Sequence, residues 1–179
     1  MFTLASYITT MSHYEVKQHA FNAFKQWAKQ IGFIIEIETI EKDMNSKIQF
    51  DLSIYLKRGY KYPFHITFYN IPKDLFAIRA KIALTTLDED SLNTMPKGTK
   101  EQVYMDIRKY IFPLQINIYT ASGIELIKWL TIDSACNNKQ FFIDQLFNFR
   151  NAMELVRIRF DELYYYLWPH GKSENEYGI

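Results

Sequence analysis

The stretch that decides the fold is Asn137–Trp168, NNKQFFIDQLFNFRNAMELVRIRFDELYYYLW, near the end of a chain of 179 residues. It holds neither glycine nor proline. Its large apolar residues recur alternately four and three positions apart: Phe142, Leu146, Phe149, Met153, Val156, Phe160, Leu163 and Leu167. This spacing predicts one amphipathic helix, which at 1.5 Å per residue would run for about 45 Å. We expect its first half, up to about Val156, to pack on a sheet and its second half to project beyond its own core.

The end of this helix predicts a protein interface. Beyond Val156 the segment carries more large apolar side chains than a stable monomer leaves in water. We therefore predict a homodimer whose interface contains Phe160, Leu163, Tyr164, Leu167 and Trp168. The alternative is that this end folds back onto the sheet of its own chain.

The segments before residue 85 predict one helix followed by a sheet. Ser12 and Glu15 have the spacing of a capping box, and Gly32 is suited to end the helix that begins there. The apolar period then changes from 3.6 to 2, which predicts antiparallel strands over 33–40, 48–56 and 64–69. Residues 75–84 suit a helix by their alanines, but their strict alternation favours a fourth strand.

The remaining segments complete an α+β fold. Residues 88–90 begin a short helical turn, Thr99–Phe112 carries helical spacing, and Pro113 ends it. Leu114–Ile132 then reads as a hairpin of two strands before the long helix. The order is helix, three or four strands, helix, two strands and helix, which predicts an antiparallel sheet with helices packed on one face. We expect a flexible extension over 1–11, a single domain over 12–168 and a disordered tail over 169–179, with Met11 as an alternative start.

Composition narrows the classes of function. The 21 Lys and Arg nearly balance the 20 Asp and Glu, so no global charge attracts nucleic acid or an anionic membrane. The single cysteine, Cys136, excludes an internal disulfide framework and fits a reducing compartment. No apolar run is long enough for a membrane helix. The sequence therefore predicts a cytoplasmic protein with no membrane partner.

The clearest local binding signal is an alternation of aromatic and cationic residues around one turn. Its members are Tyr55, Lys57, Arg58, Tyr60, Lys61, Tyr62 and Tyr69. Such a surface can bind a polypeptide, which we predict, or stack the bases of single-stranded nucleic acid, which is the alternative. A third reading is a plain solvated surface beside the turn.

Residues suited to catalysis or metal binding form no convincing pattern. Ser53, His65 and Asp51 can be drawn on one sheet face as a hydrolase triad, but the water-exposed face of a sheet commonly carries such residues without catalysis. The four histidines lack metal-ligand spacing, and no glycine-rich phosphate loop occurs. We read residues 88–90 as charge at a helix start and Cys136, in a turn, as an ordinary thiol. We predict no catalytic residue, metal or cofactor.

The element order and the closing pattern, Leu114–Ile132 followed by Asn138-Lys139-Gln140-Phe141-Phe142-Ile143 at the start of the long helix, resemble the type III secretion chaperone-like fold. The resemblance covers Ser12 to about Trp168 and implies a homodimer that binds extended polypeptide. Secretion chaperones tend to be shorter and acidic, whereas this chain is longer and nearly neutral. The resulting hypothesis is a non-enzymatic, homodimeric, chaperone-like binding protein, with a nucleic-acid-associated accessory protein as the alternative.

Overall fold

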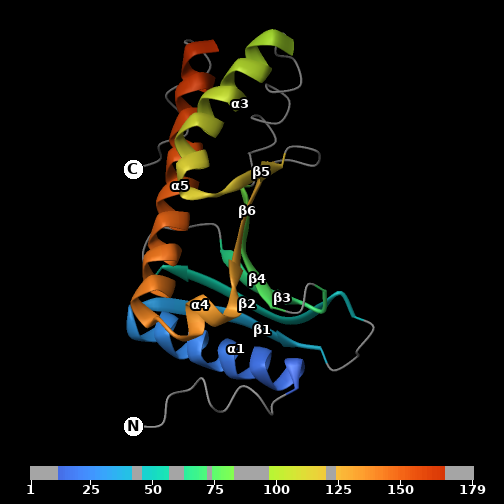
Figure 1. The fold of residues 1–179 in the computed structure, drawn as a ribbon. Helices are drawn as coiled ribbons and strands as arrows, with labels where there is room; N and C mark the ends of the chain where they lie inside the picture. The colour runs from blue at the N-terminus through green and yellow to red at the C-terminus, as the bar shows by residue number, and fades with distance from the viewer. Residues whose placement is uncertain are drawn as a thin grey trace.

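A computed structural model describes residues 12–41, 46–56, 63–71, 74–82, 97–119 and 124–167 of the chain (Figure 1). The helices in these ranges are α1 (His13–Gln30), α3 (Lys97–Ile111), the 3₁₀ turn η3 (Phe112–Leu114), α4 (Ile132–Cys136) and α5 (Lys139–Leu167). The strands are β1 (Phe33–Ile40), β2 (Ile48–Leu56), β3 (Phe64–Tyr69), β4 (Leu75–Ile82), β5 (Asn117–Tyr119) and β6 (Ile124–Thr131).

The six strands form one antiparallel sheet in the order β1-β2-β3-β4-β6-β5. The predicted α+β class, with a long last helix, is therefore confirmed. The first four strands form a meander, and residues 75–82 of the ambiguous segment are its fourth strand. Strand β6 pairs with β4 although residues 83–123 lie between them in sequence. This pairing brings the second half of the chain to the meander.

Local chemistry explains the bounds of α1. The backbone N–H of Glu15 donates to Ser12 Oγ at 3.3 Å, and the backbone N–H of Ser12 donates to Glu15 Oε2 at 2.7 Å. This reciprocal pair is the predicted capping box. After Ile31 the chain passes through Gly32 with a φ of +91°, a conformation that a residue without a Cβ adopts readily. The predicted start and end of the helix are both confirmed.

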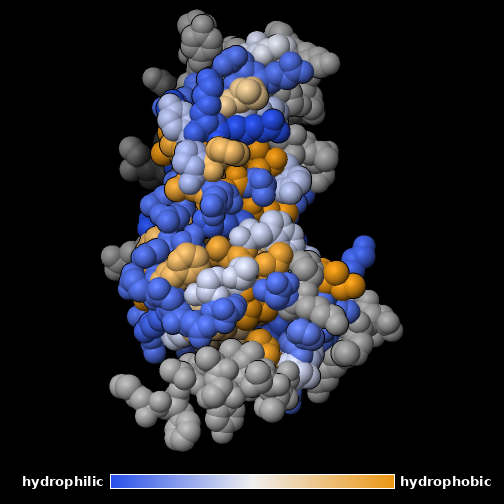
Figure 2. Space-filling view, in the orientation of Figure 1, coloured by the Kyte–Doolittle hydropathy of each residue, from blue (hydrophilic) through white to orange (hydrophobic). Residues whose placement is uncertain are grey.

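Helices α1 and α5 cover one face of the sheet, and the core lies between (Figure 1). At its centre the rings of Phe24 in α1 and Phe142 in α5 stack, with centroids 4.1 Å apart and planes 12° apart. Both side chains are fully buried, and Phe76 of β4 lies against both rings. Hydrophilic residues cover most of the outer surface of α1 and α5 (Figure 2). The apolar side of each helix therefore faces the core.

The second half of α5 projects beyond the sheet, as predicted, but it does not project alone. Helix α3 packs along it, and together they form an arm that extends beyond the sheet (Figure 1). The Phe160 ring lies 6.0 Å from the ring of Tyr104 in α3, and Phe160 is buried within the single chain. The predicted place of Phe160 in a dimer interface is corrected accordingly, because a helix of the same chain already covers it.

Three smaller predictions are also corrected. Leu114 lies in η3 instead of a strand, because Pro113 fits the first turn of a 3₁₀ helix, and β5 begins only at Asn117. Ile132 begins α4, which buries Ile132 and Ala135, and its N–H donates to Asp74 O at 2.9 Å. Cys136 therefore ends a short helix and does not lie in a loop. Burial, with Asp133 nearby, raises the pKa of its thiol to about 12, so an activated thiolate is not favoured.

Candidate functional site

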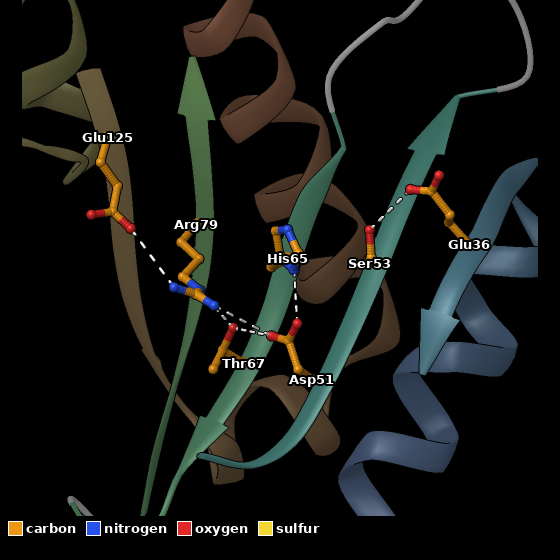
Figure 3. Close-up of polar contacts among 7 residues, drawn as sticks. All are labelled: Glu36, Asp51, Ser53, His65, Thr67, Arg79 and Glu125. Carbon is orange, nitrogen blue, oxygen red and sulfur yellow. Dashed lines mark hydrogen bonds and ion pairs between the residues drawn. The ribbon is translucent and has the colours of Figure 1, made fainter. Parts of the chain in front are cut away.

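The candidate site is the face of the sheet opposite α1 and α5, which we call the open face. No described helix packs on it (Figure 1). Strand alternation brings polar side chains from four strands to its middle: Asp51 from β2, His65 and Thr67 from β3, Arg79 from β4 and Glu125 from β6 (Figure 3). The register places Asp51 opposite Thr67 and His65 opposite Arg79. Residues far apart in sequence thus form one cluster.

Asp51 is the centre of this polar cluster. His65 Nδ1 lies 2.8 Å from Asp51 Oδ2, and the Thr67 hydroxyl donates to Asp51 Oδ1. Arg79 Nε donates to Thr67 Oγ1 at 2.9 Å. The terminal nitrogens of Arg79 lie 3.9 Å from Asp51 Oδ1 and 3.9 Å from Glu125 Oε1. Arg79 therefore bridges two carboxylates without a short bond to either of them.

The surroundings of Asp51 also set its ionisation. Its partial burial acts to raise its pKa, but hydrogen bonds from His65 and Thr67 and the positive charge of His65 and Arg79 act in the opposite direction. The net effect is a pKa below the usual value for an aspartate. Asp51 is therefore an anion at neutral pH, and its charge is held by neighbours on β3 and β4.

An aromatic pair lies beside the polar cluster. The rings of Tyr69 in β3 and Trp129 in β6 have centroids 5.2 Å apart, although β4 runs between their strands. The register puts Ala77 of β4 between Thr67 and Trp129, and Ala77 is fully buried. Its methyl group is small enough to let the two rings meet across β4. Burial raises the pKa of Tyr69, an effect that nearby Arg79 opposes and that Glu125 and Asp51 reinforce.

The hydrolase triad is not assembled, because the Ser53 hydroxyl has another partner. Ser53 lies opposite His65 in the register, yet its Oγ donates to Glu36 Oε2 at 3.4 Å (Figure 3). An irregularity in β1 between Ile35 and Ile37 brings the Glu36 side chain to the open face. His65 and Asp51 are thus paired as a hydrolase triad requires, but the Ser53 hydroxyl is not bonded to His65.

The structure separates the members of the predicted aromatic and cationic patch. Tyr55 lies at the end of β2, where its register partner is Ile34 of β1. Tyr69 pairs with Ile48 at the opposite end of the β2–β3 ladder and packs on Trp129. These two tyrosines therefore do not share one site, which corrects the grouping of Tyr69 with the turn. Residues 57–62, which hold the other members, lie outside the described residues.

The remaining predicted positions can be placed only in part. Leu163, Tyr164 and Leu167 belong to the last turns of α5, while Trp168 lies outside the described residues. The predicted extension over 1–11, the helical turn at 88–90 and the tail over 169–179 also lie outside the described residues. Within the described ranges, no three His, Cys, Asp or Glu side chains are grouped so as to hold a metal ion. No described helix is long and apolar enough to cross a bilayer.

Three residues of the open face escaped the sequence reasoning: Arg79, Glu125 and Trp129. Their only local signal is that each lies at an outward position of an alternating strand. Their meeting depends on the pairing of β4 with β6, which no short-range pattern encodes. Lys17 was missed as well, because it occupies the apolar stripe of α1 and is buried.

Comparisons with known proteins identify a shared fold without a function. No known protein family and no curated protein matches the chain. A crystal structure of an uncharacterized protein from Methanothermobacter thermautotrophicus is similar, with a TM-score of 0.64 and 12% sequence identity. The match covers 80% of this chain and 97% of the other. Nearly the whole architecture of that protein is therefore similar to the fold described above.

Proposed function

We infer that this protein is a non-enzymatic binding protein that holds a polypeptide partner on the open face of its sheet. The observation that carries this inference is the Tyr69–Trp129 pair beside the Arg79 cluster, on a face that no described helix covers. Tyr, Trp and Arg are the residue types most enriched where proteins bind proteins. The resemblance to the chaperone-like fold points in the same direction and remains a prediction.

The charges of the open face favour a polypeptide over nucleic acid. Asp51, Glu125 and Glu36 place three carboxylates there, and these would repel a phosphate backbone. Arg79, the cation at the centre of the cluster, is already shared between two of them. A peptide can match such a mixed surface with side chains of either sign. Nucleic acid therefore remains the second candidate.

The test is selection of peptides on the purified protein. A phage library of random dodecapeptides is enriched on the wild type, and binding of the recovered peptides is measured by fluorescence anisotropy. We expect Trp129→Ala to weaken binding by about tenfold or more, as loss of an aromatic anchor does. Phe112→Ala is the control, because Phe112 is also an exposed aromatic side chain, 79% exposed against 38% for Trp129, and it lies in η3, outside the sheet.

Two results would overturn the proposal. One is that no peptide is enriched above a blank surface. The other is that Trp129→Ala binds the recovered peptides as tightly as the wild type and Phe112→Ala do. A fluorescent oligothymidylate is measured in parallel at low and high salt. If the oligothymidylate binds tightly and its affinity falls steeply with salt, nucleic acid and not polypeptide is the ligand of the open face.

A further inference from the structure

Strand β1 is an edge of the sheet whose outer side has no strand partner among the described residues. It pairs with β2 alone, over the length Phe33–Ile40. The opposite edge is the much shorter β5, Asn117–Tyr119, next to which α3 packs. An edge strand presents a row of backbone N–H and C=O groups that a further strand can satisfy. Among the described residues, the sheet thus has one long edge without a strand partner on its outer side.

The side chains at this edge are apolar and acidic. Ile37 is 56% exposed and Ile40 is 47% exposed, although both are large hydrophobic residues. Glu36 faces the open side, where it accepts from Ser53, and Glu38 reaches Lys25 of α1 on the helix side, with Nζ and carboxylate 2.5 Å apart. Glu41 follows directly after the strand. The described residues of this edge therefore place carboxylates on both sides of the strand, and Lys25 of α1 pairs with one of them.

This charge pattern disfavours pairing of two β1 strands from two copies of the chain. An antiparallel pair of two β1 strands centred on Glu38 would put that carboxylate opposite its own copy on the helix side. Like charges directly opposite each other destabilise a pair of strands. Acidic residues on an edge thus act against self-association, while they leave the edge open to a strand of opposite charge.

We propose that β1 accepts an extended, basic segment of a partner protein as a seventh strand of the sheet. This rests on the proposed function, since it names the kind of polypeptide bound and the way it is held. The backbone of the segment pairs with the outer side of β1, its lysine or arginine side chains meet Glu36 and Glu38, and its apolar side chains cover Ile37 and Ile40. The added strand also widens the open face beyond β1.

The test uses three synthetic peptides of about ten residues on the intact protein. The probe has the sequence VKKVTVKKVT, with lysines on both faces of the strand. The second peptide replaces every lysine by glutamate, and the third keeps the lysines but carries N-methyl groups on alternate backbone nitrogens. We expect the lysine peptide to bind, the other two to bind at least about tenfold more weakly, and amide exchange to slow along β1 in the complex.

Variants separate this inference from the proposed function. The double change Glu36→Lys and Glu38→Lys is expected to weaken the lysine peptide about tenfold or more and to strengthen the glutamate peptide, which also shows that the variant is folded. If N-methylation and the double change leave binding intact while Trp129→Ala abolishes it, the open face binds peptide without β1 and the inference is wrong. If none of these synthetic peptides binds and no library peptide binds, both this inference and the proposed function are wrong.

Discussion

Two lysines of the described residues are buried, and their amines differ in the number of hydrogen-bond acceptors around them. Lys17 of α1 is 1% exposed, and its Nζ donates to Tyr69 O, to Gln49 Oε1 at 3.3 Å and to Asn70 O at 3.3 Å. Lys128 of β6 is buried as well, and the hydrogen bond described for its Nζ goes to Leu114 O. Burial lowers the pKa of Lys128. Lys17 therefore links α1 to the sheet through three hydrogen bonds, whereas the single hydrogen bond described for Lys128 offsets less of the cost of burying its charge.

The two lysines are expected to respond differently to substitution by methionine. Lys17→Met takes the donor from one buried and two partly buried hydrogen bonds, so it should lower the free energy of unfolding by about 1–3 kcal/mol. Lys128→Met removes a charge that burial penalises, so the loss should be smaller or absent. Urea unfolding of both variants at pH 7 measures the difference, and a larger loss for Lys128→Met would contradict this account.

The pH dependence of Lys128 gives a second check. Its folded pKa lies below its unfolded value, so the unfolded chain keeps the proton to higher pH than the folded one does. The free energy of unfolding should therefore rise with pH between the folded pKa and the unfolded value near 10.4. In Lys128→Met this alkaline rise should be reduced. Equal slopes in wild type and variant would show that the amine is hydrated in the folded protein.

Asp51 is expected to stabilise the fold as an anion. Asp51→Asn keeps the shape but weakens the bonds to His65, Thr67 and Arg79, so it should cost about 1–2 kcal/mol at pH 7. Because the folded pKa of Asp51 is lowered, its contribution is complete above the unfolded pKa of about 3.9. The contribution is lost as the pH falls through the folded pKa. The gap between wild type and Asp51→Asn, measured by urea unfolding from pH 7 to pH 3, should therefore narrow with acid.

At the scale of elements, stability depends on aromatic packing between α1, the sheet and α5. Phe24, Phe76 and Phe142 contact one another, and all three are fully buried. Phe68 of β3 joins them through Phe24 and Phe76. Aromatic pairs of this kind contribute about 0.5–1.5 kcal/mol beyond the area they bury. These rings therefore fix the first half of α5 to the meander.

Removal of the Phe142 ring should weaken the packing of α1 and α5 on the sheet. Phe142→Ala is expected to lower the free energy of unfolding by about 3–5 kcal/mol, because it leaves a cavity under both helices. Phe112→Ala, which removes the same side chain from an exposed position, should change it by less than about 0.5 kcal/mol. Thermal and urea unfolding measure both. Similar losses in the two variants would place the Phe142 ring outside the core.

Sequence periodicity predicted the elements better than it predicted their ends and contacts. The alternation of β2, β3 and β4, the capping box of Ser12 and the apolar seam of α5 depend on neighbours within a few residues, and they were read correctly. The cover of Phe160 by Tyr104 was not predicted, because it depends on how α3 returns across α5. The same applies to α4, whose short run of residues has too few turns to show a helical period.

The candidate site was predicted in part for the same reason. Asp51, His65 and Ser53 were placed on one face, since the alternation of β2 and of β3 can be read within each strand and the two strands are consecutive in sequence. The bulge at Glu36 then gives Ser53 a partner that alternation alone does not reveal. Arg79, Glu125 and Trp129 enter through β4 and β6, whose register is a property of the folded chain.

At the scale of the whole molecule, the protein consists of a sheet with its covering helices and an arm of α3 and the second half of α5 (Figure 1). The described part of the arm exposes Met105, Tyr110 and Ile158. The Arg159 guanidinium lies 5.1 Å from the centroid of the Tyr110 ring and links the two helices at the surface. Large apolar side chains on an arm are typical of a surface that another protein covers.

The homodimer stays a prediction, and light scattering tests it. If the apolar seam at the end of α5 joins two copies, the double change Leu163→Lys and Leu167→Lys should convert a dimer into a monomer, since two cations per chain would enter the interface. The control places a lysine at Ile71, an apolar residue outside the arm that is 80% exposed. A dimer that survives the double change would exclude the end of α5 as the interface.

The pairing of β4 with β6 also has a consequence for the order of folding. The meander β1–β4 joins neighbours in sequence, whereas β6 reaches β4 only after residues 83–123 have closed into a loop. Closing a loop of that length carries an entropic cost that contacts within the meander do not bear. We therefore expect α1 and the meander to be structured in the transition state and the β4–β6 pair to form late. Ile66→Val should then slow folding, and Leu126→Ala should mainly speed unfolding, so the last third of the chain joins a sheet that has already been built.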